Sequence, residues 1–196
     1  MKHIIIEGGD GLGKDTLIKG LCSHFDYDNI IIRHFGKPPS YYLKDPKQSI
    51  YYQFEQFNKE ADLLNCIYDK ASIYYENIVI WNRSHLGEYV YSQMFRGIKE
   101  KEIKKRLIVF EDRWEFNNIP RFLITLTADP EFFLSKEDGQ SFSKNIEQKT
   151  KELQLFREVH FLSKIEKKLL IKVNNGDKFR SKKDILDETL NLIIKL

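Results

Sequence analysis

Residues 7–16 read Glu-Gly-Gly-Asp-Gly-Leu-Gly-Lys-Asp-Thr, the most informative segment of the chain. Within it, Gly8-x-x-x-x-Gly13-Lys14 has the spacing of a phosphate-binding loop, whose backbone N–H groups wrap closely around phosphate oxygens. Glycines at 8, 11 and 13 leave room for that approach, and Lys14 brings a positive charge toward the β- and γ-phosphates. An apolar run at 4–6 precedes the loop as a buried strand, and apolar residues follow it at helical spacing. The stretch therefore predicts a bound nucleoside triphosphate, whereas the alternative is a glycine-rich turn that binds nothing.

One position of the loop departs from the usual pattern. Asp15 stands where a Ser or Thr normally places its hydroxyl on Mg²⁺, and Thr16 follows one residue later. A carboxylate oxygen is also a good ligand for this hard cation, so the departure is compatible with metal binding. We expect Asp15 to support Mg²⁺ beside the phosphates of ATP. The residues expected to hold those phosphates are Gly8, Gly11, Gly13, Lys14, Asp15 and Thr16.

Composition limits the class of protein. A chain of 196 residues suits a single α/β domain, 1–196, and a net charge of +3 gives little support for nucleic-acid binding. Cys22 and Cys66 form no Cys-x-x-Cys pair, so we expect neither a disulfide framework nor a structural zinc site. No segment reaches the ~20 apolar residues of a membrane span, and the first residues lack the apolar core of a signal peptide. We expect a cytoplasmic protein with small-molecule nucleotide partners and no membrane contact.

Apolar runs alternate with amphipathic stretches along the rest of the chain. Strands are predicted at 4–6, 30–32, 78–81, 122–126 and 169–173, and helices at 49–76, 84–95, 99–113, 143–167 and from 181 onward. Continuous apolar strands that alternate with helices indicate an α/β fold, with a five-stranded parallel sheet covered by helices on both faces. Ligands of such sheets bind at the carboxyl ends of the strands.

Polar residues follow the predicted strands at those ends. The third strand leads into Asn82-Arg83-Ser84, where Arg83 can bind phosphates through both arms of its guanidinium group. The structural alternative is an arginine at a helix start that pairs with a carboxylate such as Glu88. The fifth strand leads into Asn174-Asn175-Gly176-Asp177, which suits a slot for a nucleobase and an ordinary turn equally well.

Several of these segments together resemble the thymidylate kinase family. They are the loop Glu7-Gly8-x-Asp10-Gly11-x-Gly13-Lys14-x-Thr16, the strand end Arg83-Ser84 and the stretch Asp129-Pro130-Glu131, and their order matches the family along nearly the whole chain. The resemblance implies a P-loop kinase with a Rossmann-like sheet, an acceptor-nucleotide region at about 35–76 and a lid at about 135–149. It also implies transfer of the γ-phosphoryl group of ATP to the 5′-phosphate of dTMP or a close analogue, with Mg²⁺ as cofactor.

Other activities stay open at this point. Related deoxynucleoside kinases carry Glu-Arg-Ser where this chain has Asn82-Arg83-Ser84, and a kinase that acts on a polynucleotide end or a modified base in DNA is a further alternative. A nucleotide-binding switch or regulatory ATPase is disfavoured, because the corresponding strand of such proteins usually ends in an Asp that supports Mg²⁺. Dimers are common in the thymidylate kinase family, and the amphipathic stretch 84–95 suits a helix interface between two copies.

The resemblance also implies roles for single residues near the phosphates. Asp10 matches the acidic loop residue that contacts the sugar hydroxyl of the acceptor, and Arg83 matches the arginine that bridges donor and acceptor phosphates. Lys136 and Lys144 lie in the lid, where the family often places arginines that stabilise the transferring charge. The alternative for these lysines is an ordinary solvated surface loop.

Three residues are candidates for binding the acceptor. Arg33 is a candidate for its phosphate, Phe54 for stacking on its base, and Gln53 for hydrogen bonding to the edge of that base. Aromatic residues at the spacing of this segment more often belong to the core, so the identity of the base stays open.

Asp15 and Asn82 depart from the family pattern together. Thymidylate kinases usually have Ser or Thr at the first position and Asp at the second, so this chain keeps one carboxylate at a different place. We hypothesise that Asp15 takes over the anionic support of Mg²⁺ while Asn82 keeps a neutral contact. The alternatives are a weakened metal site and a non-catalytic nucleotide binder.

Overall fold

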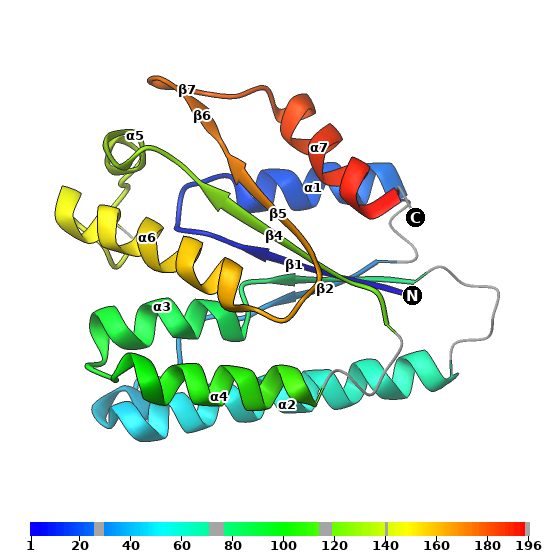
Figure 1. Ribbon diagram of the computed structural model, residues 1–196, viewed down its shortest axis with the longest axis vertical. Coiled ribbons are helices and arrows are strands. Elements are labelled where there is room, and N and C mark those ends of the chain that lie inside the picture. Colours follow the sequence, from blue (N-terminus) through cyan, green and yellow to red (C-terminus); the bar gives the residue numbers. More distant parts are fainter. Residues whose placement is uncertain (26–29, 71–76, 114–118, 140, 195–196) are drawn as a thin grey trace.

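The computed structural model describes residues 1–25, 30–70, 77–113, 119–139 and 141–194. Its centre is a five-stranded sheet in the order β2-β3-β1-β4-β5, in which all neighbouring strands are parallel (Figure 1). The strand that leads into the phosphate-binding loop therefore lies in the middle of the sheet. The strands are β1 (Lys2–Glu7), β2 (Ile30–His34), β3 (Ile78–Asn82), β4 (Arg121–Thr127) and β5 (Lys167–Lys172).

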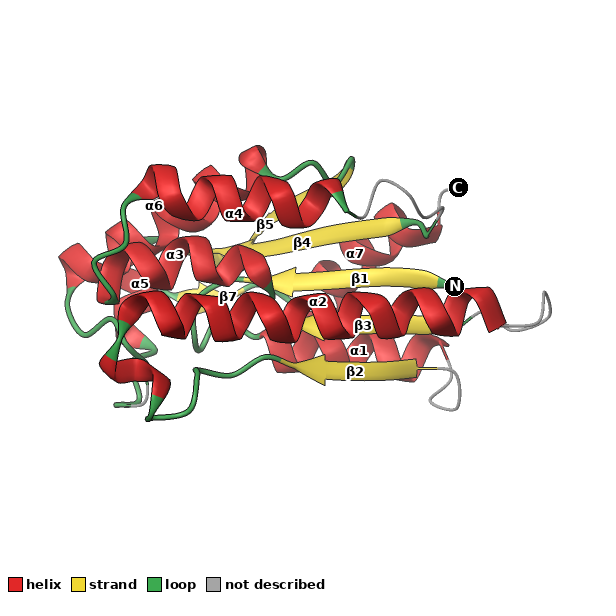
Figure 2. Cartoon of the chain, turned by 90° about the horizontal axis from the view of Figure 1, so that it is seen from below, coloured by secondary structure: helices red, strands yellow, loops and turns green. Residues whose placement is uncertain are grey.

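Helices cover both faces of this sheet (Figure 1). One face is covered by α1 (Lys14–Phe25) and α7 (Lys182–Ile194), and the other by α2 (Pro46–Lys70), α3 (His85–Phe95), α4 (Glu100–Asp112) and α6 (Ile146–Leu162). Figure 2 shows α2 running alongside the strands. The smaller elements are a 3-10 turn, η2 (Tyr42–Lys44), the short helix α5 (Pro130–Ser135), and a hairpin of β6 (Asn174–Asn175) and β7 (Lys178–Phe179). No helix in the described ranges is both long and apolar enough to span a membrane.

The burial of β1 explains why its sequence is apolar without interruption. Ile5 belongs to the core beneath α2, α3, α4 and α6, whereas Ile4 and Ile6 belong to the core beneath α1 and α7. Successive side chains of a strand point to opposite faces, and both faces are covered here, so each of the three isoleucines is fully buried. This two-sided burial confirms the α/β fold predicted from the continuous apolar runs.

Several elements differ from the sequence prediction, and three of the differences concern helices. The predicted helix 143–167 ends at Leu162, because Lys167 already pairs with Phe122 in the sheet. The predicted helix 49–76 begins earlier, at Pro46, where the missing N–H of proline costs no hydrogen bond in a first turn; residues 71–76 lie outside the described part. The short helix α5 was not predicted, because Asp129-Pro130 was interpreted only as the end of β4.

Phe133 of α5 packs directly on the phosphate-binding loop. A Cβ atom added at Gly9 would lie 2.2 Å from Cζ of Phe133, so this ring occupies the space beside the glycine. On another side of the ring, Nζ of Lys149 lies 3.9 Å from the ring centroid. Phe133 and Lys149 are both fully buried. The loop, α5 and α6 therefore meet at one aromatic side chain.

We predict that Gly9→Ala lowers the free energy of unfolding by about 1–3 kcal/mol, because Phe133 cannot move away without straining a packed core. Gly36→Ala is the matched control, since a Cβ there has no neighbour within 4 Å. Urea unfolding followed by circular dichroism measures both variants. If Gly9→Ala is as stable as the control, the close packing of Phe133 on the loop is not a constraint on this fold.

Candidate functional site

The phosphate-binding loop connects β1 with α1. Gly8, Gly11 and Gly13 have positive φ angles of 136°, 83° and 89°, a backbone conformation that side chains disfavour. Space also excludes a side chain at Gly8, because a Cβ there would lie 2.6 Å from the carbonyl oxygen of Leu126. Helix α1 begins at Lys14, so its N-terminal N–H groups face the same region as the loop. The backbone therefore has the form that binds phosphate in other proteins.

The ammonium group of Lys14 is folded back over the loop. Its Nζ donates hydrogen bonds to the carbonyl oxygens of Gly8 and Gly9, each at 2.8 Å, and lies 3.7 Å from Oδ1 of Asp10. Burial lowers the pKa of Lys14, since the charged form loses hydration there. This cation has little contact with water, so an anionic ligand beside it would interact strongly with it.

Arg83 is held next to the loop by its backbone. Its N–H donates to the carbonyl oxygen of Ile6 at 3.0 Å. Its φ angle is 66°, and no other non-glycine residue in the described part has a positive φ. Such strain persists where the surroundings enforce it, often at functional sites. The guanidinium pairs with Asp10 and not with Glu88, which pairs with Arg96 instead. The carboxylate that pairs with Arg83 is therefore Asp10 of the loop, so the side chain of Arg83 faces the loop.

Asp15 and Asn82, the two positions that depart from the family pattern, are in direct contact. Nδ2 of Asn82 donates a hydrogen bond to Oδ1 of Asp15 at 2.8 Å, and it also lies 2.9 Å from Nδ1 of His34. The buried Oδ1 of Asn82 has no hydrogen-bond partner among the described residues. The carboxylate of Asp15 is thus oriented by the amide that replaces the expected aspartate.

Two cavities meet beside Arg83. The first lies over the loop and has a volume of about 430 Å³, whereas the second lies between β2, α2 and α3 and has a volume of about 30 Å³. Phe35, Gly36 and Arg83 line both cavities, so ligands in the two cavities would both contact Arg83. The other residues of the first cavity are Asp10, Gly11, Gly13, Lys14, Asp15, Thr16, His34 and Asn82.

The second cavity contains polar residues that sequence reasoning missed. The buried hydroxyl of Tyr91 donates to Oε1 of Glu152 at 3.1 Å, and burial raises the pKa of Tyr91. Arg96 and Glu88 form an ion pair at the wall of this cavity, and the ring of Phe142 lies 5.7 Å from that of Tyr91. The stretch 84–95 was interpreted as an interface helix. These polar residues could have been found from the sequence, because polar residues recur at 84, 88, 91–92 and 96, which is the spacing of residues on one face of a helix.

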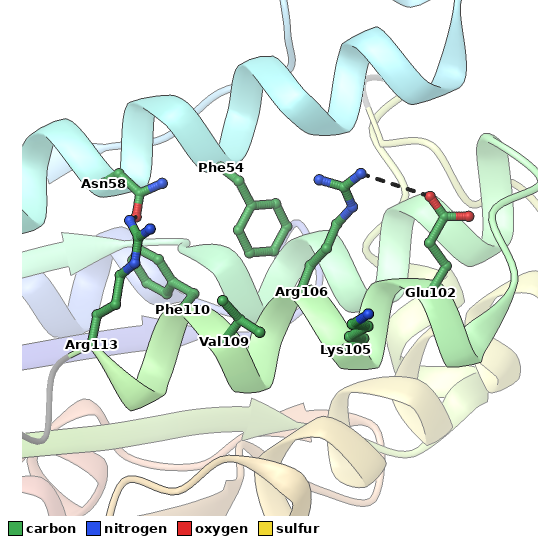
Figure 3. Close-up of a pocket in the computed structure, with 8 residues that line it drawn as sticks. All are labelled: Phe54, Asn58, Glu102, Lys105, Arg106, Val109, Phe110 and Arg113. Carbon is green, nitrogen blue, oxygen red and sulfur yellow. Dashed lines mark hydrogen bonds and ion pairs between the residues drawn. The ribbon is translucent and has the colours of Figure 1, made fainter.

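The three predicted acceptor residues do not come together. Gln53 lines the second cavity, where its Nε2 donates to the carbonyl oxygen of Gly36 at 2.8 Å. Phe54 is buried against Phe110 and lines a separate groove between α2 and α4 (Figure 3). Gln53 and Phe54 are adjacent on α2, their side chains point about 100° apart, and they line different cavities here. Arg33 forms an ion pair with Glu60 at 2.9 Å and lines neither of the two cavities. Phe54 and Arg33 therefore lie outside the two cavities beside Arg83, and their roles at the acceptor stay predictions.

The lysines of the lid segment 135–149 lie in different surroundings. Lys144 is exposed and pairs with Glu137 at 3.1 Å, while the buried Lys149 pairs with the same carboxylate at 2.8 Å. Hydrogen bonding from Lys149 holds the pKa of Glu137 well below its usual range. Lys136 belongs to the part of the segment next to the loop, because its carbonyl oxygen would lie 3.3 Å from a Cβ at Gly11. Of the two predicted lid lysines, Lys136 has only its backbone beside the loop, since its Nζ lies 4.7 Å from the ring centroid of Phe132. Lys144 is paired with Glu137.

The predicted nucleobase slot forms part of the hairpin after β5. Asn174 ties this hairpin to the end of β4, because its Nδ2 donates to Oδ2 of Asp129 at 2.9 Å. The same nitrogen donates to the carbonyl oxygen of Gly176 at 2.8 Å. A cavity of about 620 Å³ lies beside the hairpin and is lined by Phe179 among others. The base-binding role of this region stays a prediction.

Glu7 is a buried carboxyl group beneath the site. Its Oε1 accepts hydrogen bonds from Oγ of Ser84 at 2.5 Å and from the N–H of Gly87 at 3.3 Å. Its Oε2 has no hydrogen-bond partner among the described residues. Burial outweighs these hydrogen bonds and raises the pKa of Glu7 to about 7. A carboxyl group at this position therefore titrates near neutral pH.

Comparisons with known proteins support the fold. No protein-family model and no curated protein matches this chain. Among solved structures, it is similar to that of the YorR protein from Bacillus subtilis in complex with phosphorylated GDP. The TM-score is 0.63 at 22% sequence identity, and the alignment covers 98% of this chain and 95% of YorR. At this identity the likeness shows the shared α/β fold alone, and the resemblance to thymidylate kinases stays a prediction.

We predict that Glu7 makes the protein less stable as the pH rises. The unfolded carboxyl group ionises near pH 4.5 and the folded one near pH 7, so the stability contribution is fully present below pH 4.5 and is lost as the pH rises through 7. Between pH 4.5 and 8, the free energy of unfolding of Glu7→Gln should therefore rise by up to about 3 kcal/mol relative to that of wild type.

Urea unfolding at several pH values measures this difference. Glu131→Gln, which changes an exposed carboxylate of α5, is the control and should follow the wild-type pH dependence. A constant difference between Glu7→Gln and wild type across the pH range would contradict the raised pKa of Glu7.

Proposed function

We propose that this chain transfers the γ-phosphoryl group of ATP to a deoxynucleoside monophosphate, dTMP or a close analogue. The observation that carries the proposal is the sharing of Arg83 by the two cavities, one over the phosphate-binding loop and one beside α3. One guanidinium at their junction can contact both the donor and the acceptor phosphates. The phosphorylated GDP in the similar YorR structure supports a phosphorylated nucleotide as ligand of this fold.

Phosphoryl transfer requires mainly alignment and neutralisation of charge. The loop amides and Lys14 would hold the donor phosphates, and Lys14 would leave its carbonyl partners to do so. Arg83 is oriented before the ligands arrive, because its backbone is held by Ile6 and its side chain by Asp10. A cation that is already oriented loses little entropy when it binds the transferring group.

The residues present fit Mg²⁺ as the cofactor. Asp15 would hold the ion and Asn82 would keep that carboxylate in place. Mg²⁺ usually keeps several waters and takes one or two carboxylates together with substrate phosphates, so the single carboxylate of Asp15 is compatible with this ion. When bound, it would neutralise phosphate charge during the transfer.

The acceptor would enter the second cavity. Gln53 and Tyr91 provide polar groups there, and Arg96 provides a second cation. A volume of about 30 Å³ holds roughly one water molecule, so a nucleotide requires Phe142 and the lid to move outward before closing over it. Closure of such a lid would exclude water that otherwise hydrolyses ATP.

A nucleoside acceptor is the second candidate, and Glu7 is the observation that favours it. A hydroxyl nucleophile needs a general base, and a carboxylate that titrates near pH 7 suits that task. Glu7 is only 1% exposed, however, and lines neither cavity, so a 5′-hydroxyl would reach it only after local opening. A monophosphate acceptor is already ionised and needs no base.

A transfer assay with γ-labelled ATP distinguishes these alternatives. Each deoxynucleoside monophosphate, each deoxynucleoside and a DNA oligonucleotide are offered separately with Mg²⁺. We expect label in a deoxynucleoside diphosphate. Label only in nucleoside monophosphates would favour the second candidate, label only on the oligonucleotide would favour a polynucleotide kinase, and release of phosphate alone would overturn both kinase proposals.

We predict that Arg83→Lys lowers kcat by about 10²-fold or more, because a point charge cannot replace a planar group that contacts two phosphates. Lysine keeps a side chain on the same strained backbone, so the free energy of unfolding should change little. Steady-state kinetics and urea unfolding test both parts. An unchanged kcat would show that Arg83 does not take part in phosphoryl transfer and has only a structural role.

We predict that Asp15→Ser raises the Mg²⁺ concentration needed for half-maximal activity, because the carboxylate beside the phosphates is lost. Adding Asn82→Asp should recover much of that loss, since the two side chains are in contact and would exchange one role. The kinetics of the four proteins at varied Mg²⁺ form a double-mutant cycle. If the effects of the two substitutions on the Mg²⁺ requirement are strictly additive, Asp15 and Asn82 do not exchange one role.

A further inference from the structure

A groove on the surface away from the phosphate-binding loop has the chemistry of a second ligand site. It lies between α2 and α4, and Phe54 projects from α2 toward α4 at its centre (Figure 3). Phe54 and Phe110 are buried at its base, whereas Val109 is 50% exposed. The groove thus presents an apolar surface that a flat organic group can cover.

Cations border this apolar surface. Arg106 and Arg113 extend from α4 toward α2 on opposite sides of Phe54, and Lys105 is exposed on the same helix (Figure 3). Arg113 donates one hydrogen bond to Asn58 at 3.1 Å. The contact of Arg106 with Glu102 is long, at 3.9 Å, and both side chains are more than a third exposed. Each guanidinium therefore keeps donors that can bind an anion.

The dimensions of the groove suit a nucleotide. Its volume is about 410 Å³, close to the about 430 Å³ of the cavity over the phosphate-binding loop. An aromatic base against Phe54 and Val109 would place phosphates within reach of the arginines on either side. The three cations outnumber the single carboxylate of Glu102 among the lining residues, so the charge of the groove favours an anionic ligand.

One layer of aromatic rings separates this groove from the second cavity. Phe57 lines the second cavity, and its ring centroid lies 5.8 Å from that of Phe54 and 6.0 Å from that of Phe110. Close-packed rings transmit small displacements, because they have no free volume into which to relax. A ligand on Phe54 and Phe110 would therefore influence the wall of the second cavity.

We propose that the groove between α2 and α4 binds a nucleoside phosphate as an effector, through Arg106 and Arg113 on either side of Phe54. The binding part of this inference is independent of the catalytic activity. The effect on the acceptor rests on the function proposed above, because it acts through Phe57 on the cavity assigned to that acceptor.

Equilibrium dialysis with labelled adenylyl imidodiphosphate, an ATP analogue that resists hydrolysis, tests the binding. Wild type should bind about two equivalents of the analogue. Lys14→Ala and Arg106→Gln/Arg113→Gln should each bind about one, because the first loses the cavity over the loop and the second loses the groove. The affinity of the groove should fall at least about ten-fold in the arginine double variant. Lys104→Gln is the matched control, because it removes a cation of the same helix that does not line the groove. It should bind as wild type does.

Two further probes test the kind of ligand. Inorganic tripolyphosphate and adenosine should each compete at the groove more weakly than the intact analogue. Tripolyphosphate contacts only the cations, and adenosine contacts only the apolar surface. Tripolyphosphate that competes equally well would overturn a nucleoside phosphate as the ligand. One equivalent in wild type, or unchanged binding to the arginine double variant, would overturn the site itself.

Kinetics test the regulatory part separately. Titrating the analogue should change the KM for the acceptor in wild type and in Lys104→Gln, with no such change in Arg106→Gln/Arg113→Gln. Identical acceptor KM responses in all three proteins would overturn the coupling through Phe57. If no acceptor is phosphorylated, the proposed function fails, while the dialysis result still decides whether the groove is a site.

Discussion

The backbone hydrogen bond from Arg83 to Ile6 is the constraint on which the site depends. It extends the parallel pairing of β3 with β1, in which Ile6 lies opposite Asn82, beyond the end of the strand. The chain then turns through a left-handed residue, which directs the guanidinium to Asp10 in the loop. The carboxyl ends of β3 and β1 lie side by side, so Arg83, which follows β3, is placed beside the phosphate-binding loop, which follows β1. Ligands of parallel sheets are expected at these carboxyl ends. Without this register, the two cavities would not share a cation.

Buried polar and aromatic contacts beneath the phosphate-binding loop support this arrangement. Phe133 fills the space beside Gly9, and Lys149 lies over its ring and pairs with Glu137 of the predicted lid segment. On the other side, Glu7 accepts hydrogen bonds from the start of α3, at the cost of a raised pKa. Breaking the first set would leave the buried ammonium group of Lys149 without its carboxylate, and breaking the second would leave the buried carboxyl group of Glu7 without hydrogen bonds. Both losses cost free energy in a protein interior. The loop is therefore held between two buried networks.

The parts of this structure that were predictable are those encoded by local pattern. Five apolar runs predicted the five strands, and the loop spacing predicted the glycines that leave room for phosphate. The positive φ angles of those glycines are a finding of the structure. Side-chain direction was not predictable, because it depends on which helix face meets the sheet. Gln53 and Phe54 are neighbours in sequence, yet only Gln53 lines the second cavity. The burial of Lys149 was likewise hidden, since its partner Glu137 lies in a loop whose path no periodicity indicates.

A bisubstrate ligand tests the central claim that one arginine serves two adjoining nucleotide sites. Adenosine and deoxythymidine joined through five phosphates would occupy the donor cavity, the acceptor cavity and the junction at Arg83 together. Isothermal titration calorimetry should find it at least about 100-fold tighter than ATP, because the second half binds without a further loss of translational freedom. Arg83→Lys should remove most of that gain. A bisubstrate ligand that binds no more tightly than ATP would contradict the claim that the two cavities form one site.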